Sequence, residues 1–298
     1  MYHVPVLLQD CIDGLNIKPA GIYVDVTFGG GGHSRLILEK LGPNGRLIAF
    51  DRDNDAEANR PDDERFQLVK SDFRFLKNYL KFLKINQIDG ILADLGVSSH
   101  QFDTPERGFS FRFDARLDMR MDQNAEKDAA YVLNSYDHEQ LSNVLYEYGE
   151  FTNSRRIADA LLVARTEAPL ETTFQLNAVL RRFYREREES KFLARIYQAI
   201  RIEVNGELES LKALLEDGCE MLAKEGRFVV LSYHSLEDRL VKNYFRAGKY
   251  SGEPDKDFYG NVLWTMKPMK SKITKAGEEE LKVNSRARSA KLRIAEKL

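Results

Sequence analysis

The sequence has few of the residues that form disulfides or thiolate metal sites. Its 298 residues include two cysteines, Cys11 and Cys219, which stand far apart in segments with helical patterns. Such spacing fits neither a disulfide framework nor a zinc site, so both are expected to be buried thiols without a catalytic role. A reducing, cytoplasmic setting is therefore expected.

Long apolar runs and an excess of one charge are also lacking. The segment MYHVPVLLQDCIDGL has no basic start followed by a long apolar stretch, and no run approaches the length of a membrane span. Lys and Arg total 45 against 47 Asp and Glu, for a formal net charge of -2. This balance excludes a global basic field, so any contact with nucleic acid must come from local patches.

The first hundred residues alternate short apolar runs with helical patterns. This alternation predicts an α/β fold with a parallel sheet of βαβ units. Strands are expected at residues 22–27, 46–50, 66–69 and 88–93, with helices at 34–41 and 75–83.

After residue 93 the pattern changes to an arginine-rich loop at 96–122, then to helical periodicity up to about residue 202. Asp137, and either Thr172 or Thr173, are expected to cap helices there. Sheet and helix patterns then return, with a helix at 207–224, a strand at 228–232, a helix at 236–245 and edge strands at 262–266 and 290–294. We therefore expect a core from residues 1–104 and 203–298 and an inserted loop and helical subdomain at 105–202.

The strongest local signal is YVDVTFGGGGHS at residues 23–34, where a strand leads through four glycines into a helix. Glycines at such a turn let the backbone approach a ligand. Asp51 ends the next strand, where an acid can accept hydrogen bonds from both ribose hydroxyls of a nucleoside. A dinucleotide and S-adenosylmethionine both fit, but Ser34 stands where G-x-G-x-x-G needs its third glycine, which favours S-adenosylmethionine.

Other candidate residues follow the later strands. Asp72 and Phe73 follow the third, where they could hold an adenine or simply cap a helix and fill the core. Asp94 follows the fourth and could orient an amine of the cofactor or of the acceptor. His33 is expected to orient the glycine loop, since no second ligand stands at metal spacing. His234 follows the fifth strand and either contacts the acceptor or is satisfied by backbone.

Several segments are particular to one family. YVDVTFGGGGHS, IAFDRD, DLGVSSHQFD, ERGFSFR, LDMRMD, QAIRIEVNGELE, SYHSLEDR and SRARSAKLR occur in this order from residue 23 to residue 293. Together they resemble the bacterial small-subunit ribosomal RNA cytosine-N4 methyltransferases, the family also called MraW or RsmH. The resemblance implies a class I, Rossmann-like methyltransferase core with a helical insertion that recognises the substrate. It also implies methylation by S-adenosylmethionine of the exocyclic N4 amine of a cytidine in the decoding region of 16S rRNA.

The resemblance also carries residue roles. It implies cofactor contacts at Gly31, Gly32, His33, Asp51, Phe73, Asp94 and Gln101. Ala115 and Arg116 stand where the family usually has a Gly-Pro pair, and His100 where proline is common, so the shape of the RNA surface can differ here. Methyl transfer from a sulfonium needs alignment and no metal. Asp94, with Ser98 or His234, is the candidate to hydrogen-bond the weakly nucleophilic cytosine amine.

RNA contacts are expected from arginines. The cytidine must leave its stack, and flanking phosphates could be bound by Arg107, Arg112, Arg116 and Arg120 in the arginine-rich loop, or by Arg286 and Arg288 in the basic tail. The loop arginines could instead pair with the interleaved Asp114, Asp118 and Asp122. The expected partner is 16S rRNA within the small ribosomal subunit, and the choice between monomer and homodimer stays open. A non-catalytic assembly factor that keeps the cofactor pocket and a dinucleotide-dependent dehydrogenase are the competing functions.

Overall fold

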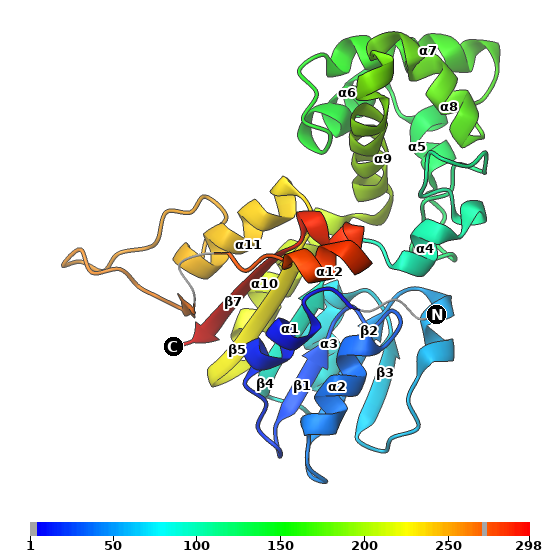
Figure 1. The fold of residues 1–298 in the computed structure, drawn as a ribbon. Coiled ribbons are helices and arrows are strands. Elements are labelled where there is room, and N and C mark those ends of the chain that lie inside the picture. Colours follow the sequence, from blue (N-terminus) through cyan, green and yellow to red (C-terminus); the bar gives the residue numbers. More distant parts are fainter. Residues whose placement is uncertain (1–4, 270–272) are drawn as a thin grey trace. The chain divides into compact units, whose positions relative to one another are not determined.

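The computed structural model describes residues 5–269 and 273–298 (Figure 1). The chain divides into two compact units, one formed by Met1–Gly96 and Leu208–Leu298 and the other by Val97–Glu207. The second unit therefore starts before, and ends after, the 105–202 predicted for the insertion. Over the described residues, no helix combines the length and the apolar character that crossing a membrane requires.

The first unit is built on a seven-stranded sheet with the order β3-β2-β1-β4-β5-β7-β6. Strands β1 to β5 are parallel, and β7 runs antiparallel to both β5 and β6. The α/β, Rossmann-like class predicted from the sequence is confirmed. The strands are β1 Ile22–Asp25, β2 Arg46–Asp51, β3 Phe66–Lys70, β4 Ile88–Asp94, β5 Leu222–Ser232, β6 Met266–Pro268 and β7 Lys291–Lys297.

The strand order reverses direction between β1 and β4. From β1 the chain builds outward through β2 to β3, then returns to lay β4 on the other side of β1, with Val24 opposite both Ile48 of β2 and Ile91 of β4. In open α/β sheets such a reversal leaves a crevice outside the carboxyl ends of the two central strands. Here those ends carry Asp25 and Asp94.

Helices cover both faces of the sheet (Figure 1). Alternate strand residues point to opposite faces, so Val24, Ile48 and Ile91 pack in the cluster that includes side chains of α3 and α10, while Tyr23 and Leu47 pack with those of α1 and α2. Both cysteines are buried free thiols, as expected from the sequence. The helices of this unit are α1 Leu8–Leu15, α2 Gly32–Lys40, α3 Leu76–Phe82, α10 Glu207–Met221, α11 Ser235–Ala247 and α12 Glu278–Val283.

Two boundaries differ from the sequence prediction. The helix expected to reach residue 224 ends at Met221, and Leu222 already pairs with Ile88 of β4. The edge strand predicted near 262–266 is present but displaced along the chain, because β6 begins at Met266 and ends at Pro268. Val262 instead bridges to Lys256 in a hairpin outside the sheet, so an apolar run there serves a local turn.

The second unit is helical around its own apolar cluster. Asp137 and Thr172 cap α6 and α8 through reciprocal bonds with Gln140 and Gln175, as predicted. The loop predicted at 96–122 contains an unpredicted helix, α4, whose five residues are too few to show a helical period. The helices are α4 Ser99–Asp103, α5 Ala129–Ser135, α6 His138–Glu147, α7 Ser154–Glu167, α8 Thr173–Leu180 and α9 Glu189–Asn205.

Candidate active site

The glycine run forms a tight turn between β1 and α2. Gly29 and Gly31 have φ of 50° and 73°, a region that glycine enters without strain. A Cβ on Gly31 would lie 2.9 Å from the Phe28 ring, and one on Gly32 would lie 2.2 Å from Cγ of Pro5. The turn therefore requires glycine at both positions. Because α2 begins at Gly32, its first N–H groups lack helical acceptors and can meet a polar ligand.

Asp51 ties this turn to the end of β2. Its Oδ2 accepts the Gly29 N–H at 2.8 Å and its Oδ1 accepts the Asp53 N–H at 2.8 Å. Each carboxylate oxygen keeps a further lone pair, which is what two ribose hydroxyls require. Burial raises the pKa of Asp51, and the two backbone donors offset only part of that shift.

A buried acid that the sequence analysis did not single out lies beneath the glycine turn. Asp25, 1% exposed, accepts the Ser34 hydroxyl at 2.7 Å and the Thr27 N–H at 3.1 Å. Burial raises its pKa, while the adjacent His33 lowers it. An acid inside the apolar strand YVDV was the available signal, since a buried charge needs a reason.

His33 stands at the start of α2 and is 6% exposed. Its Nδ1 lies 3.9 Å from Oδ2 of Asp94, and burial lowers its pKa. Within the described part of the chain, its Nε2 is buried without a hydrogen-bond partner. An orphaned ring nitrogen beside a glycine turn is suited to a polar ligand atom.

Asp94, at the end of β4, is held from two sides. Its N–H donates to Thr27 Oγ1 at 2.6 Å, and its Oδ1 accepts the Tyr233 hydroxyl at 2.6 Å. Burial and the neighbouring Asp94 raise the pKa of Tyr233, so the phenol stays a proton donor to the carboxylate at neutral pH. Tyr233 stands in the SYHSLEDR segment that drew attention to His234, and the sequence analysis passed over it.

Two other candidates have structural partners. Asp72 caps the short helix after β3 by accepting the Arg74 N–H at 2.8 Å, and its Oδ2 accepts from Arg52 at 3.0 Å. Phe73 packs against the apolar cluster beneath. These are the cap and core roles that the sequence left open beside an adenine contact, and the Phe73 ring is only partly buried.

His234 is engaged in capping α11. Its Nδ1 accepts the Glu237 N–H at 3.4 Å, while Glu237 Oε2 accepts the Tyr233 N–H at 2.9 Å. The local backbone role that the sequence kept as an alternative is therefore present. Ser98 and Gln101, in the second unit, cap α4 in the same reciprocal manner, with bonds of 3.0 and 3.1 Å.

The arginine-rich loop of the second unit mostly pairs its charges internally. Arg120 makes two parallel bonds to Asp118, of 2.8 and 2.6 Å, and a third to the Ala125 carbonyl. Arg107 is buried and donates to the carbonyls of Arg120 and Met121. Intramolecular pairing, the alternative left open by the sequence, thus holds for these arginines.

The remaining arginines are more accessible. Arg116 is 69% exposed yet pairs with Asp128 at 2.9 Å, an acid outside the interleaved Asp114, Asp118 and Asp122 that the sequence offers as partners. Arg112 and Arg288 are exposed. The side chain of Arg286 lies outside the described residues.

LDMRMD, the motif before α5, has a structural explanation. Leu117, Met119 and Met121 are buried in the core of the second unit. The Asn205 side chain donates to the Met119 carbonyl at 2.7 Å and accepts the Met121 N–H at 2.8 Å, as a neighbouring strand would. The motif fixes the path of the loop.

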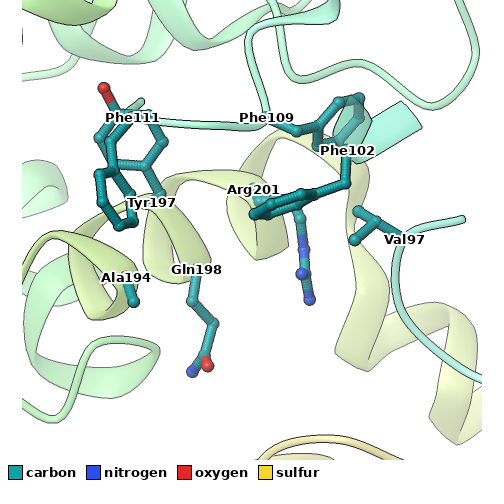
Figure 2. A pocket seen from close by; sticks show the side chains of 8 residues that line it. All are labelled: Val97, Phe102, Phe109, Phe111, Ala194, Tyr197, Gln198 and Arg201. Carbon is teal, nitrogen blue, oxygen red and sulfur yellow. The ribbon is translucent and has the colours of Figure 1, made fainter. Parts of the chain in front are cut away.

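An aromatic hollow of about 140 Å³ lies inside the second unit (Figure 2). An apolar cavity of about 150 Å³ accommodates benzene, so this one can take a single six-membered ring. Gln198 and Arg201 of α9 stand at its edge, and Arg201 is fixed by two bonds to Glu207 of 2.8 and 2.9 Å. The lining residues are Val97, Phe102, Phe109, Phe111, Ala194, Tyr197, Gln198 and Arg201.

Comparison with known proteins identifies the family. A model of the MraW methylase family matches residues 1–298. The chain belongs to this family. The family and the class of enzyme, a methyltransferase, that the sequence predicted are thereby confirmed.

MraW methylase relatives align over nearly their full length. Ribosomal RNA small subunit methyltransferase H of Flavobacterium johnsoniae is 56% identical over 297 residues, covering 100% of this chain and 98% of the relative. The proteins of the same name from Christiangramia forsetii and Bacteroides fragilis are 52% and 51% identical, covering 100% and 99% of this chain and 98% and 97% of theirs. Among solved structures, an rRNA methylase from Streptococcus thermophilus gives a TM-score of 0.43 at 12% identity, covering 100% of this chain and 99% of that one.

Proposed function

We propose that this chain uses S-adenosylmethionine to methylate the exocyclic N4 amine of a cytidine in the decoding region of 16S rRNA. The carrying observation is the group of residues at the carboxyl ends of β1, β2 and β4. This group combines the turn that requires glycine, Asp51 with its spare acceptor lone pairs, and Asp94, which accepts a hydrogen bond from Tyr233. Full-length relatives named for small-subunit rRNA methylation support the RNA substrate. Its place of action is the cytoplasm, where ribosomal subunits are assembled.

The cofactor fits the residues at the crevice. Asp51 accepts the ribose hydroxyls, while the backbone of Gly31 and Gly32 and the unpartnered Nε2 of His33 meet the polar methionyl end. Phe73 contributes a ring face for the adenine. Gln101, which stands in the second unit, completes the set that the family resemblance implies. When bound, the cofactor supplies an activated methyl group on a sulfonium.

Asp94 acts on the acceptor amine. The cytosine amine is a poor nucleophile because its lone pair is delocalised into the ring. A carboxylate that accepts one of its N–H bonds favours a more tetrahedral nitrogen and receives the proton as the C–N bond forms. The bonds from Tyr233 and to Thr27 hold Asp94 in one orientation, which the transfer requires. Ser98 and His234 contact the acceptor RNA in this scheme, in addition to their capping bonds.

The second unit recognises the RNA. Its exposed Arg112 and Arg116, with Arg288 of the first unit, are the arginines that bind flanking phosphates. Arg107 and Arg120 shape the loop from inside. The aromatic hollow accepts an unstacked neighbouring base, since single-stranded RNA is read largely by stacking on aromatic rings (Figure 2).

The deciding experiment is methylation of small ribosomal subunits with labelled S-adenosylmethionine, followed by mapping of the modified nucleotide. We expect one labelled cytidine, methylated at N4, in the decoding region. Asp94→Asn should lower kcat by about 10² to 10⁴ while S-adenosylhomocysteine still binds. Cofactor binding without methyl incorporation by the wild type would instead establish the non-catalytic assembly factor.

A further inference from the structure

Helix α11 presents a basic face to solvent. Arg239, Lys242, Arg246 and, just beyond the helix, Lys249 are exposed at intervals of three, four and three positions, the spacing of one helix face. We call Arg239, Lys242 and Arg246 the basic face. It stands out because the whole chain has a net charge of -2 and no general attraction for nucleic acid.

The acids of the same helix point inward, so they do not neutralise this face. Glu237 is 2% exposed and accepts the Tyr233 N–H in the cap of α11. Asp238 accepts from Arg293 of β7 at 2.7 Å and from Lys291 at 3.0 Å. Those partners lower the pKa of Asp238, so it stays ionised inside its own ion pairs. The two acids of α11 therefore lie on the side of the helix that faces β7 and the cap.

A hairpin that follows α11 carries two exposed aromatic rings at its tip. Phe258 and Tyr259 are 97% and 86% exposed, and their rings contact edge to face at 5.6 Å. The tip is ordered by Asp257, whose carboxylate accepts the Tyr259 N–H at 2.9 Å and bonds from Asn261 of 2.8 and 2.9 Å. In Figure 1 this orange segment extends away from the sheet beyond α11.

The helix connects these features to the crevice. Its N-terminus follows Tyr233, whose hydroxyl donates to Asp94, and its C-terminus leads through Lys249 into the hairpin. Arg246 donates to the Gly252 carbonyl at 2.8 Å, and Lys249 pairs with Asp255, so the hairpin base is fixed to the helix end. Cations followed by aromatic rings are the combination that binds single-stranded nucleic acid without reading its sequence.

We propose that the basic face of α11 and the Phe258–Tyr259 tip form a track for a single-stranded segment of the ribosomal RNA. Phosphates lie along Arg239, Lys242 and Arg246, and unstacked bases pack on the two rings. The proposal rests on the RNA methyltransferase function above and adds an RNA-binding surface to it. The track leads one end of the bound strand toward Asp94.

The test measures binding of a labelled, unstructured 12-nucleotide RNA by fluorescence anisotropy across a range of salt concentrations. Replacing Arg239, Lys242 and Arg246 together by Gln should weaken binding and reduce the slope of log affinity against log salt by about two, from roughly 0.7 per lost phosphate contact. The double variant Phe258→Ala/Tyr259→Ala should weaken binding on the order of tenfold per ring and leave that slope unchanged.

Matched controls come from elsewhere in the first unit. Lys40, Lys81 and Lys84 are exposed beside α2 and α3, and their triple replacement by Gln makes the same change in net charge. Phe82 is 80% exposed, so Phe82→Ala removes a comparable ring. Neither control should alter affinity by more than about twofold. The triple variant also removes the Arg246 bond to Gly252, which could loosen the hairpin. The single variant Lys242→Gln keeps that bond, so weaker RNA binding by this variant reports the loss of charge alone.

Trp264 provides a local signal. It is the only Trp of the sequence and stands in the returning arm of the hairpin, 51% exposed. RNA bound at the tip should quench its fluorescence in the wild type and in the lysine control. Unchanged affinity, salt slope and quenching in both track variants would overturn the proposal.

The outcomes separate this proposal from the proposed function. Track variants that bind RNA normally while the wild type methylates small subunits would refute the track alone. A wild type that incorporates no methyl group would refute the function, whatever the RNA affinities are. If the aromatic double variant keeps RNA affinity but loses self-association in sedimentation, the tip binds a second copy and the RNA track is wrong.

Discussion

The carboxyl edge of the sheet and the arginine-rich loop of the second unit both carry several acids. Folding shifts the pKa values of these acids in opposite directions in the two regions. At the sheet edge, Asp25 and Asp51 accept hydrogen bonds mainly from neutral groups, and burial raises the pKa of each. In the loop, the Arg120 guanidinium lowers the pKa of Asp118. A buried acid whose ionised form is disfavoured by folding marks a candidate ligand site. An acid that is paired with a cation in the folded state instead stabilises the structure.

The largest effect that follows concerns Asp51. Asp51→Asn should weaken S-adenosylhomocysteine binding by about 10² or more, because hydrogen bonds to a charged acceptor contribute roughly 1.5–3 kcal/mol each and two ribose hydroxyls are involved. The melting temperature should change little, since the substitution also removes a charge that burial disfavours. Isothermal titration calorimetry and thermal unfolding measure the two effects.

A matched control lies nearby on the exposed turn after β2. Glu57→Gln removes a carboxylate with a 59% exposed side chain and should leave the affinity unchanged. If Asp51→Asn instead lowered stability by several kcal/mol and kept ligand affinity, the crevice acid would be a structural group like Asp118. The contrast between the two regions would then be wrong.

Much of the sheet could be predicted because its strands are short apolar runs between turn residues. Elements too short to show a hydrophobic period, such as α4, were harder to predict. The sequence signal of α4 is its cap, formed by Ser98 and Gln101. The edge strand predicted near 262–266 is displaced because an apolar segment can form the arm of a hairpin as well as a sheet edge. Sequence pattern reports which residues are apolar, but pairing partners distant in sequence decide where they pack.

The site was predictable where backbone chemistry requires a residue type. Gly31, Gly32 and Asp51 belong to this class, because a turn with positive φ and a strand-end acid leave a local signature. Tyr233 was missed, since its bond to Asp94 joins residues 139 positions apart. The arginines of the loop could not be sorted by sequence either, because Arg107 and Arg112 differ only in burial.

The loop gives the second prediction. Arg120→Lys should destabilise the protein by about 2–4 kcal/mol, because a lysine cannot form two parallel bonds to Asp118 and a third to the Ala125 carbonyl, which leaves partly buried acceptors unpaired. Arg112→Lys, at an exposed position of the same loop, should change stability by less than about 0.5 kcal/mol. Urea unfolding compares the two. Equal midpoints for both variants would show that the Arg120 pair is dispensable.

The smallest expected effect is on the pH dependence of stability, which should have opposite signs for Asp118 and Asp51. A folded-state pKa below the unfolded one, as for Asp118, adds stability that is present above about pH 3.9 and disappears as pH falls through the folded pKa. A folded-state pKa above the unfolded one, as for Asp51, adds stability that is present at low pH and disappears as pH rises through the folded pKa.

The two asparagine variants should therefore change in opposite directions relative to the wild type, and in different pH ranges. Asp118→Asn loses relative stability as pH rises from the folded pKa of Asp118 to about 3.9, because only the wild type gains the ionised pair with Arg120. Asp51→Asn gains relative stability as pH rises above about 3.9, because it has no buried charge to form. Parallel trends in urea unfolding would mean that the acids of both regions are paired alike, and the crevice would lose its distinguishing electrostatic feature.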